Sequence, residues 1–456
     1  MDKFIETLNR IVWGAPALVM IVGVGIVLTI RTRGAQFKLF PLALKNFVEK
    51  LSGKGHKTEG VSSFQALCTA LAATVGTGNI AGVAGAIALG GPGAIFWMWV
   101  SAIFGMITKA AEVILAVYYR RNGNNGDYFG GPMYIIRNAM DKRWRWLALL
   151  YAFFGVVAAF GMGNATQINA VIGSVHSAAN AVGMTIDNKC DWIIGLVAGA
   201  AVAVLLLGGA KRVGRFAEIL VPFVSLAYIL ICLGVIFARI QMLPQAVMRI
   251  FQGAFTPKAV TGGAVGSAFY AFRTGISRGV FTNEAGMGTA SIAHAGADAE
   301  HPVQQGLMGI MEVFLDTIVI CTMTAFAILC SGVKISYSID EGVMLTTEAF
   351  ASVYGGWINV ALMLFLCVFA FATMLGWGLY GVRCAQYLFG ERAWRWFVIL
   401  QIAVITLSTL LKTGTVWMLA ETVNGLMAIP NLIAIWVLMP VTVKLINNFS
   451  NKIEHT

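Results

Sequence analysis

The chain has 456 residues, of which 58% are hydrophobic and only 12% are charged, and its mean hydropathy is +0.78. Soluble domains carry about 25% charged residues, so the composition excludes a soluble protein and indicates one that crosses a membrane many times. Its seven cysteines include no CxxC pair, so neither a disulfide framework nor a zinc site is indicated.

Eleven apolar runs are long enough to span a bilayer. In chain order they cover residues 11–30, 62–89, 93–119, 146–177, 191–209, 216–238, 262–282, 304–330, 357–389, 394–411 and 415–445. The sequence therefore predicts an all-α polytopic membrane protein with eleven transmembrane helices. The first run stays as a helix, because its stronger basic cluster follows it instead of preceding it as in a signal peptide.

Lysines and arginines gather in one of the two sets of alternating loops, chiefly at residues 31–57, 120–145, 211–215 and 383–395. Basic loops remain on the cytoplasmic side of a membrane. We therefore expect a plasma-membrane protein with its N-terminus outside and its C-terminus in the cytoplasm. The net charge of +11 follows from this topology, and no nucleic-acid partner is needed to explain it.

The second run is interrupted at Thr74-Val75-Gly76-Thr77-Gly78-Asn79. Glycines and β-branched residues are poor helix formers, and unpaired backbone groups at membrane depth persist only beside a cavity or inside protein. The N–H groups of Gly78, Asn79 and Ile80 would open the second half-helix, whose positive end favours a carboxylate. The carbonyls around Ala72 and Val75 would suit a cation.

The seventh run carries a second predicted break between Gly275 and Gly279. It lies five spans after the first, and the two runs cross the membrane in opposite directions. Broken helices at matching positions predict an inverted repeat that holds its substrate between the two halves. The expected parts are an extra helix and basic loop in 1–60, five-helix repeats in 61–240 and 262–446, an outer amphipathic connection in 241–261, and a cytoplasmic tail in 447–456.

Several motifs resemble those of the alanine or glycine:cation symporter family, also called the sodium:alanine symporter family. They are Gly76 to Val83, Gly90-Gly91-Pro92-Gly93 to Gly105, Gly163-Asn164-Ala165-Thr166-Gln167-Ile168-Asn169, Ser277 to Gly288, and Phe314 to Thr322. The resemblance implies the leucine-transporter fold and uptake of small neutral amino acids driven by Na⁺, or sometimes by H⁺. No P-loop pattern is present, which is consistent with a secondary transporter that is not an enzyme.

A zwitterionic substrate needs donors for its carboxylate and acceptors for its ammonium group. We expect the backbone of Gly76, Thr77 and Gly78, with the Asn79 amide, to bind the carboxylate, and carbonyls at the second break to bind the ammonium. Gln167 either joins them or links two helices. The complete predicted substrate site is Gly76, Thr77, Gly78, Asn79, Gln167, Phe269, Phe272, Gly275, Ile276, Thr373 and Trp377, where the bulky residues wall a pocket that favours alanine or glycine.

The resemblance also implies a Na⁺ site and no organic cofactor. Its ligands would be the carbonyls of Ala72, Val75 and Phe369 and the hydroxyl of Thr373. The family usually has Ser-Thr where this chain has Ala372-Thr373, so one hydroxyl ligand is missing. A water ligand or H⁺ coupling could compensate for it.

Charged residues inside spans are functional candidates. Lys109 and Glu112 share one helix face and are expected to neutralise each other. Glu312 and Asp316 lie four residues apart, and Asp316 is either a proton or gating group or part of polar packing. Arg278 and Glu284 are expected at the inner gate. His294 and His301 are expected in solvent.

Two alternative functions, outside the transporter class, are a channel and an amino-acid sensor. A channel needs a continuous polar stripe and a sensor usually has a soluble output domain, and neither is evident in the sequence. Within the transporter class, H⁺ coupling, glutamine or serine as substrate, D- against L-selectivity, stoichiometry and oligomeric state remain open.

Overall fold

A computed structural model describes residues 7–9, 11–51, 60–123, 128–181, 183–263, 265–339, 342–411 and 413–454. Its first half contains helices α2 (Ala15–Arg31), α3 (Ala35–Lys38), α4 (Phe40–Leu51), α5 (Ser63–Thr74), α6 (Val83–Gly90), α7 (Gly93–Tyr118), α8 (Pro132–Ala139), α9 (Arg145–Phe160), α10 (Thr166–Ala181), α11 (Asp191–Leu206) and α12 (Gly209–Ala238). Its second half contains α13 (Leu243–Phe255), α14 (Pro257–Thr261), α15 (Ala268–Asn283), α16 (Thr289–Ala295), α17 (Pro302–Val313), α18 (Thr322–Ser331), α19 (Val343–Tyr354), α20 (Ile358–Phe389), α21 (Ala393–Ser408) and α22 (Thr413–Glu454).

Shorter elements connect or interrupt these helices. Three are π-helical turns, η1 (Gly78–Gly82), η3 (Gly161–Ala165) and η6 (Phe314–Cys321). Three are 3₁₀ turns, η2 (Lys142–Trp144), η4 (Asn188–Cys190) and η5 (Ile240–Met242). The strands β1 (Arg121–Asn122) and β2 (Tyr128–Phe129) form an antiparallel hairpin. Turns of π-helix inside α-helices are frequent at functional sites, which directs attention to η1, η3 and η6.

By length and composition, seven helical stretches of the described chain could each cross a membrane, and eight if the bent pair α5 and η1–α6 counts as one span. The seven are Gly93–Tyr118, Lys142–Asn180, Asn188–Leu206, Gly209–Ala238, Pro302–Ser331, Ile358–Phe389 and Val416–Ile453. Two shorter apolar helices, Pro16–Arg31 and Ala393–Ser408, accompany them. The predicted polytopic helical class is confirmed, whereas the count of eleven and the inverted repeat stay predictions.

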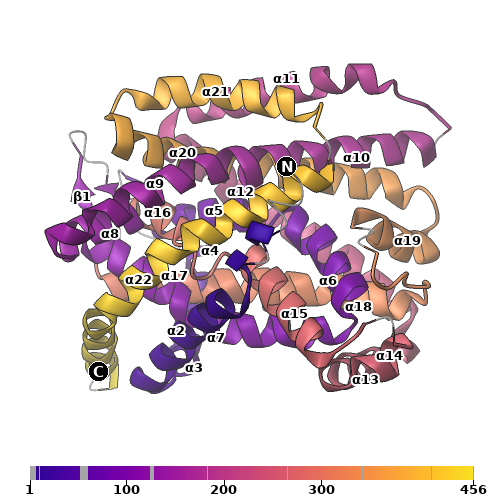
Figure 1. The fold of residues 1–456 in the computed structure, drawn as a ribbon, viewed down its shortest axis with the longest axis horizontal. Coiled ribbons are helices and arrows are strands. Elements are labelled where there is room, and N and C mark those ends of the chain that lie inside the picture. The colour runs from indigo at the N-terminus through magenta and orange to yellow at the C-terminus, as the bar shows by residue number, and fades with distance from the viewer. Residues whose placement is uncertain are drawn as a thin grey trace.

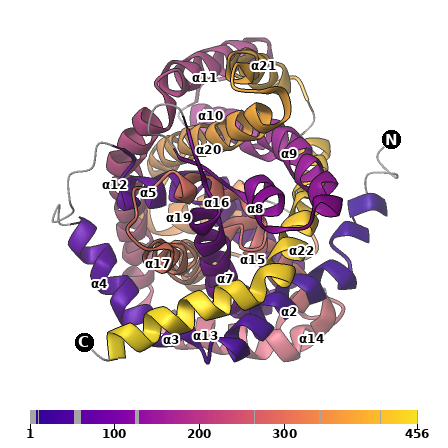
Figure 2. The same cartoon turned by 90° about the vertical axis from the view of Figure 1, so that its left-hand side faces the viewer.

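The bundle is organised around α7, which packs against α15, α16, α17, α13 and α2. Most of its apolar stretch is buried, whereas only a third of the apolar stretches of α11 and α12 is buried. Figure 1 shows α11 and α21 side by side along the top of the molecule, and Figure 2 shows α7 and α16 near the middle of the bundle. Polar residues on α7 are therefore far from lipid and need partners inside the protein.

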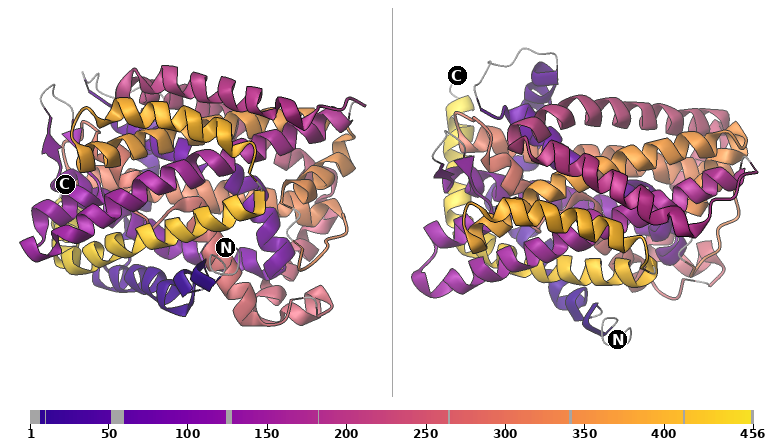
Figure 3. Two further views of the ribbon diagram at one scale, coloured as in Figure 1. Left: turned by 45° about the horizontal axis from the view of Figure 1, so that its top comes forward. Right: turned by 90° about the horizontal axis from the view of Figure 1, so that it is seen from above.

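The long helices run between two ends of the molecule (Figure 3). Helices α13, α14 and α19 lie at one end, here called the α13 end, while α8 and the β1–β2 hairpin lie at the other, here called the α8 end (Figure 1). The range 241–261, expected to be an outer amphipathic connection, contains helices α13 and α14, and α19 lies in the connection between α18 and α20.

Candidate functional site

The first helix break lies between α5 and η1. Helix α5 starts with a capping box between Ser62 and Gln65 and ends at Thr74. Val75 then takes an extended conformation, with φ −76° and ψ 100°, before the chain becomes helical again at Gly78. The two halves are bent by 54°. The predicted position of this break is confirmed, and it leaves backbone carbonyls and N–H groups without helical partners.

Side chains from α10 and α20 meet this break. The Thr77 hydroxyl donates a hydrogen bond to Gln167 Oε1 over 3.2 Å. A Cβ atom placed on Gly76 would lie 2.5 Å from Thr373 Oγ1 and 3.8 Å from Gln167 Oε1, so the approach requires glycine. The Thr373 side chain is 1% exposed, and its hydroxyl has no hydrogen-bond partner among the described residues. The structure thus brings four predicted site residues together at a buried point.

Asn79 connects the first break to η6. Its Oδ1 accepts a hydrogen bond from the Gly76 N–H over 2.9 Å, and its Nδ2 donates to Asp316 Oδ1 over 2.7 Å. In this conformation the Asn79 amide is therefore occupied by groups of the protein. Its contact with a substrate carboxylate stays a prediction.

The second helix break does not lie where the glycine pattern predicts it. Helix α15 continues without interruption through Gly275 and Gly279 and ends at Asn283. A Cβ on Gly275 would lie 2.3 Å from the Ala94 carbonyl oxygen, so this glycine allows α15 and α7 to pack closely. The prediction of unwound backbone at Gly275 and Ile276 is wrong for this conformation, and their helical carbonyls are not available for an ammonium group.

The chain instead leaves the helical path at residues 284–288. Glu284, Gly286 and Gly288 all have positive φ values, of 54°, 93° and 78°. Surrounding side chains satisfy the irregular backbone, since Asn431 Nδ2 donates to the Gly286 carbonyl over 2.9 Å and the Gly288 N–H donates to Glu112 Oε1 over 3.1 Å. This stretch between α15 and α16 is the second break.

The two breaks are joined by a continuous chain of hydrogen bonds. From Asn79 it passes to Asp316 Oδ1, and Asp316 Oδ2 accepts from the Thr317 hydroxyl over 2.9 Å. Asn283 Nδ2 donates to Thr317 Oγ1 over 3.1 Å, and the Ala285 N–H donates to Asn283 Oδ1 over 3.0 Å. The sequence marked Asp316 as an intramembrane charge, but its bond to Asn79 and the bond from Asn283 to Thr317 join residues too far apart in the chain to be inferred from spacing.

The four residues predicted to wall a pocket lie in different places. Ile276 and Trp377 are fully buried, and Trp377 Nε1 donates a hydrogen bond to Glu284 Oε1 over 3.0 Å. Phe269 is 59% exposed and packs against Phe272, which in turn contacts Trp97 with ring centroids 4.9 Å apart. These two phenylalanines belong to an aromatic cluster with α13, so the predicted wall is not assembled as one surface here.

Lys109 is paired with a residue from another helix. Its Nζ lies 3.2 Å from Glu312 Oε1, and both side chains are completely buried. Glu312 Oε2 lies 3.2 Å from His294 Nε2, and His294 has no exposed surface. The expected Lys109–Glu112 pair is wrong because α17 packs on α7 and presents a carboxylate directly. The expected solvent exposure of His294 is wrong because α16 lies inside the bundle (Figure 2).

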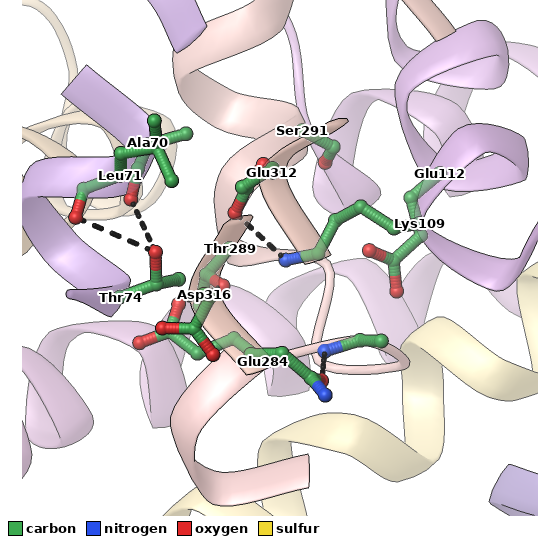
Figure 4. A network of polar contacts seen from close by, with 12 residues as sticks. Ala70, Leu71, Thr74, Lys109, Glu112, Glu284, Thr289, Ser291, Glu312 and Asp316 are labelled. Atoms are coloured by element: carbon green, nitrogen blue, oxygen red, sulfur yellow. Dashed lines mark hydrogen bonds and ion pairs between the residues drawn. The ribbon is translucent and has the colours of Figure 1, made fainter. Parts of the chain in front are cut away.

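Figure 4 shows these charges gathered in one buried region, with Lys109 and Glu112 from α7 beside Glu284, Glu312 and Asp316. None of the five side chains has exposed surface. Charges this deep are stable only when paired or hydrogen-bonded, and each of the five has such a partner.

Arg278 forms an ion pair that the sequence analysis missed. One of its guanidinium nitrogens lies 3.1 Å from Glu421 Oε1 on α22, with both side chains largely buried. The available signal was Glu421 itself, a lone carboxylate in the apolar run 415–445. The pair connects α15 to α22, the last helix of the chain.

Two of the predicted Na⁺ ligands, the carbonyls of Ala72 and Val75, lie at the end of α5. Ala72 and Val75 are each 1% exposed, and the carbonyls of the last helical turn have no N–H group ahead of them. Thr373 adds its unpartnered hydroxyl, and Phe369 lies four residues earlier on α20. Carbonyl and hydroxyl oxygens at an unwound helix suit Na⁺. The described residues include no group of three or more His, Cys, Asp or Glu able to hold a metal ion.

A family model described as the sodium:alanine symporter family matches residues 1–456. The chain belongs to this family. It is 42% identical over 448 residues to the sodium/alanine symporter AgcS of Methanococcus maripaludis, covering 97% of this chain and 95% of that protein. It is 35% identical to the probable sodium/glutamine symporter GlnT of Bacillus subtilis, covering 99% of this chain and 91% of that one.

A solved structure of MhsT in complex with L-phenylalanine is similar in fold, with a TM-score of 0.61 over 86% of this chain and 99% of that chain. The structural similarity shows the leucine-transporter fold, and at 13% sequence identity it shows nothing about substrate. As a member of the sodium:alanine symporter family, the protein is a multi-pass membrane transporter for small molecules and not an enzyme.

Proposed function

We propose that this sodium:alanine symporter family member takes up a small neutral amino acid, alanine or glycine, together with Na⁺. The observation that carries the proposal is the meeting of the α5–η1 break with Thr373, a buried hydroxyl without a partner among the described residues. Unsatisfied backbone groups and an orphan hydroxyl at one buried point are costly unless a ligand completes them. The relatives named as sodium/alanine and sodium/glutamine symporters agree with such a ligand pair.

The proposed substrate site uses the positive end of the second half-helix. The backbone N–H groups at Thr77 and Gly78 would bind the carboxylate, with Gly76 leaving room and Asn79 changing partners as substrate enters. Gln167 Oε1, which now accepts from Thr77, would accept from the ammonium group. Ile276 and Trp377 would limit the side chain, which favours alanine or glycine over larger amino acids.

The proposed Na⁺ site lies on the other side of the same break. Its ligands would be the carbonyls of Ala72, Val75 and Phe369 and the hydroxyl of Thr373. Because Thr373 lies beside Gly76, a cation bound there would also stabilise a nearby substrate carboxylate. Substrate and ion would then each increase the affinity for the other, which is the requirement for symport.

Access to this site requires motion. Thr77, Gln167 and Thr373 are at most 3% exposed, so the structure is closed over the break. We propose that eleven transmembrane helices form two inverted five-helix repeats, 61–240 and 262–446, that rock around the site after an N-terminal addition in 1–60. The N-terminus would lie outside the cell and the tail, 447–456, in the cytoplasm.

Specific observations favour a second candidate, a transporter of the same fold. It would either couple to H⁺ or prefer glutamine or serine as its substrate. Ala372 lacks the hydroxyl that the family usually supplies, and Asp316 is a fully buried carboxylate hydrogen-bonded to the broken helix. Among the relatives, one is named a putative sodium/proton-dependent alanine carrier and another a probable sodium/glutamine symporter.

The test is uptake of labelled alanine into proteoliposomes under an inward Na⁺ gradient, compared with a pH gradient and K⁺ alone. Uptake that requires Na⁺ is expected. Uptake that follows only the pH gradient would replace Na⁺ by H⁺ and direct attention to Asp316. Competition by unlabelled glycine, serine and glutamine then ranks the substrates, and preference for glutamine would contradict a pocket limited to alanine or glycine.

A further inference from the structure

A polar pocket opens at the α8 end of the molecule, in a region with no part in the proposed transport site. It is a cavity of about 210 Å³ between the β1–β2 hairpin, α8 and the turn from α20 to α21. Its lining includes Arg121 from β1, Arg137 and Tyr134 from α8, and Tyr387 from α20. A single tetrahedral phosphate group is much smaller than this volume.

Two arginines, Arg121 and Arg137, line this pocket, and a third, Arg383, lies against another lining residue. The Arg137 guanidinium lies over the Tyr387 ring, 5.9 Å from its centroid, and the Arg383 guanidinium lies 4.2 Å from the centroid of Phe129, another lining residue. Stacking on aromatic faces holds an arginine in place while its N–H groups remain able to donate. Glu391 is the carboxylate among the lining residues, and it is exposed.

The same charges converge on one hydroxyl. Burial raises the pKa of Tyr134, while Arg383, Arg121 and Arg137 act in the opposite direction, because positive charge favours the phenolate. Three guanidinium groups from three separate elements thus act on one point of the lining. A bound anion at that point would experience the same field and could accept hydrogen bonds from guanidinium and phenol groups.

Exposed aromatic residues at helix ends indicate that this pocket lies at the level of a membrane surface. Phe389 at the end of α20 is 76% exposed, Trp396 in the first turn of α21 is 71% exposed, and Trp146 in the first turn of α9 is 58% exposed. Exposed aromatic residues at helix ends gather at the boundary between hydrocarbon and headgroups. Gly390, next to Phe389, lines the pocket itself.

We propose that this pocket binds the phosphodiester headgroup of an anionic phospholipid. Arg121 and Arg137 would donate to the phosphate oxygens, with the Tyr134 and Tyr387 hydroxyls as further donors, while the acyl chains follow the exposed aromatic surface. The required chemistry is a negatively charged phosphate group, and the position beside lipid-facing aromatic residues favours a lipid over a soluble phosphate as its source. The inference is independent of the transported substrate and ion.

The experiment measures lipid binding to the purified full-length protein in detergent. Phosphatidylglycerol, phosphatidylcholine and inorganic phosphate are titrated separately, and binding is read by native mass spectrometry and by the thermal unfolding midpoint. We expect phosphatidylglycerol to bind the unchanged protein. Its affinity for the double variant Arg121→Ala/Arg137→Ala should be at least ten-fold lower. The matched control is Lys142→Ala/Arg143→Ala, which removes two exposed basic residues in η2, outside the pocket, and should bind as the unchanged protein does.

Equal phosphatidylglycerol affinity in the unchanged protein and the double variant would overturn the proposal, as would equal binding of phosphatidylcholine. Inorganic phosphate could instead bind as tightly as phosphatidylglycerol and lose this binding in the double variant. That result would overturn the proposal that the ligand is a lipid, and would show that the pocket binds a free phosphate group. Should the double variant fail to fold, Arg121→Gln alone, a change on an exposed strand, gives the same comparison with an expected loss of at least three-fold.

Discussion

Thr373 is the residue on which the ion proposal depends most directly. Its hydroxyl is buried beside Gly76 and makes no hydrogen bond with the described residues. In this conformation no hydrogen bond therefore offsets the cost of removing the hydroxyl from water. Replacing Thr373 by valine keeps the shape and removes the hydroxyl. We expect a fold as stable as before and a Na⁺ concentration for half-maximal uptake at least ten-fold higher.

The control for this change is Thr74→Val on the broken helix itself. The Thr74 hydroxyl donates back to the carbonyls of Ala70 and Leu71, so its loss should leave the Na⁺ dependence unchanged within two-fold. Wild-type Na⁺ dependence in Thr373→Val would remove Thr373 from the ion site.

Glu312 holds the charge of Lys109 inside the bundle. The substitution Glu312→Gln leaves a fully buried ammonium without a countercharge at 3.2 Å, and losing one partner of a buried pair costs about 3–5 kcal/mol. We expect a clear drop in the thermal unfolding midpoint in detergent. Adding Lys109→Met should restore at least half of it, because the unpaired charge is then gone.

The matched control is Glu49→Gln, which breaks the exposed Lys45–Glu49 pair on α4 and should change stability by less than about 0.5 kcal/mol. Finding Glu312→Gln as stable as the unchanged protein would show that Lys109 has another countercharge.

At the scale of elements, the second break depends on backbone conformations that residues with a side chain rarely adopt. Gly288 has φ +78°, and a Cβ atom there would lie 2.3 Å from Pro132 Cγ and 2.7 Å from Asn431 Oδ1. Gly288→Ala should therefore lower the unfolding midpoint and reduce transport, because α15 and α16 cannot keep their junction.

Gly262→Ala separates the effect of left-handed backbone strain from the effect of the steric clash. Its φ is +65°, similar to that of Gly288, but a Cβ there would meet nothing within 4 Å. It should carry the left-handed strain alone, about 1–2 kcal/mol, with transport retained. Equal effects of both substitutions on transport would show that packing at the second break is unimportant.

The two breaks also show what glycine patterns reveal. Gly76 and Gly78 predicted the first break correctly, because a β-branched residue between them weakens the helix further. Gly275 and Gly279 were also expected to break a helix but serve close packing of α15 on α7, where Ala94 and Ser101 leave no room for a side chain. Sequence alone does not distinguish a glycine that breaks a helix from one that packs it.

At the scale of the whole molecule, the orientation in the membrane can be tested with the protein's own cysteines. Cys190 is exposed, whereas Cys367 is partly buried and the other five are buried. With the N-terminus outside, the α10–α11 connection carrying Cys190 also lies outside. A membrane-impermeant thiol reagent added to intact cells should label the protein, and Cys190→Ser should abolish the labelling.

A cysteine introduced at Lys142 of the Cys190→Ser protein provides the opposite control. It lies in η2, in a loop predicted to be cytoplasmic, and should react only after the cells are permeabilised. Labelling of Lys142→Cys but not Cys190 in intact cells would reverse the predicted topology.

The sequence by itself determined the membrane class, the first break and the family, because hydropathy, glycine placement and long motifs are local properties of the chain. The tertiary structure alone decided which charges meet. Lys109 pairs with Glu312, Asn79 with Asp316 and Arg278 with Glu421 across long sequence separations. Close packing at Gly275 accompanies an intact α15, and the second break lies at residues 284–288. The energies of these contacts depend on which helices face each other, and no local pattern encodes that.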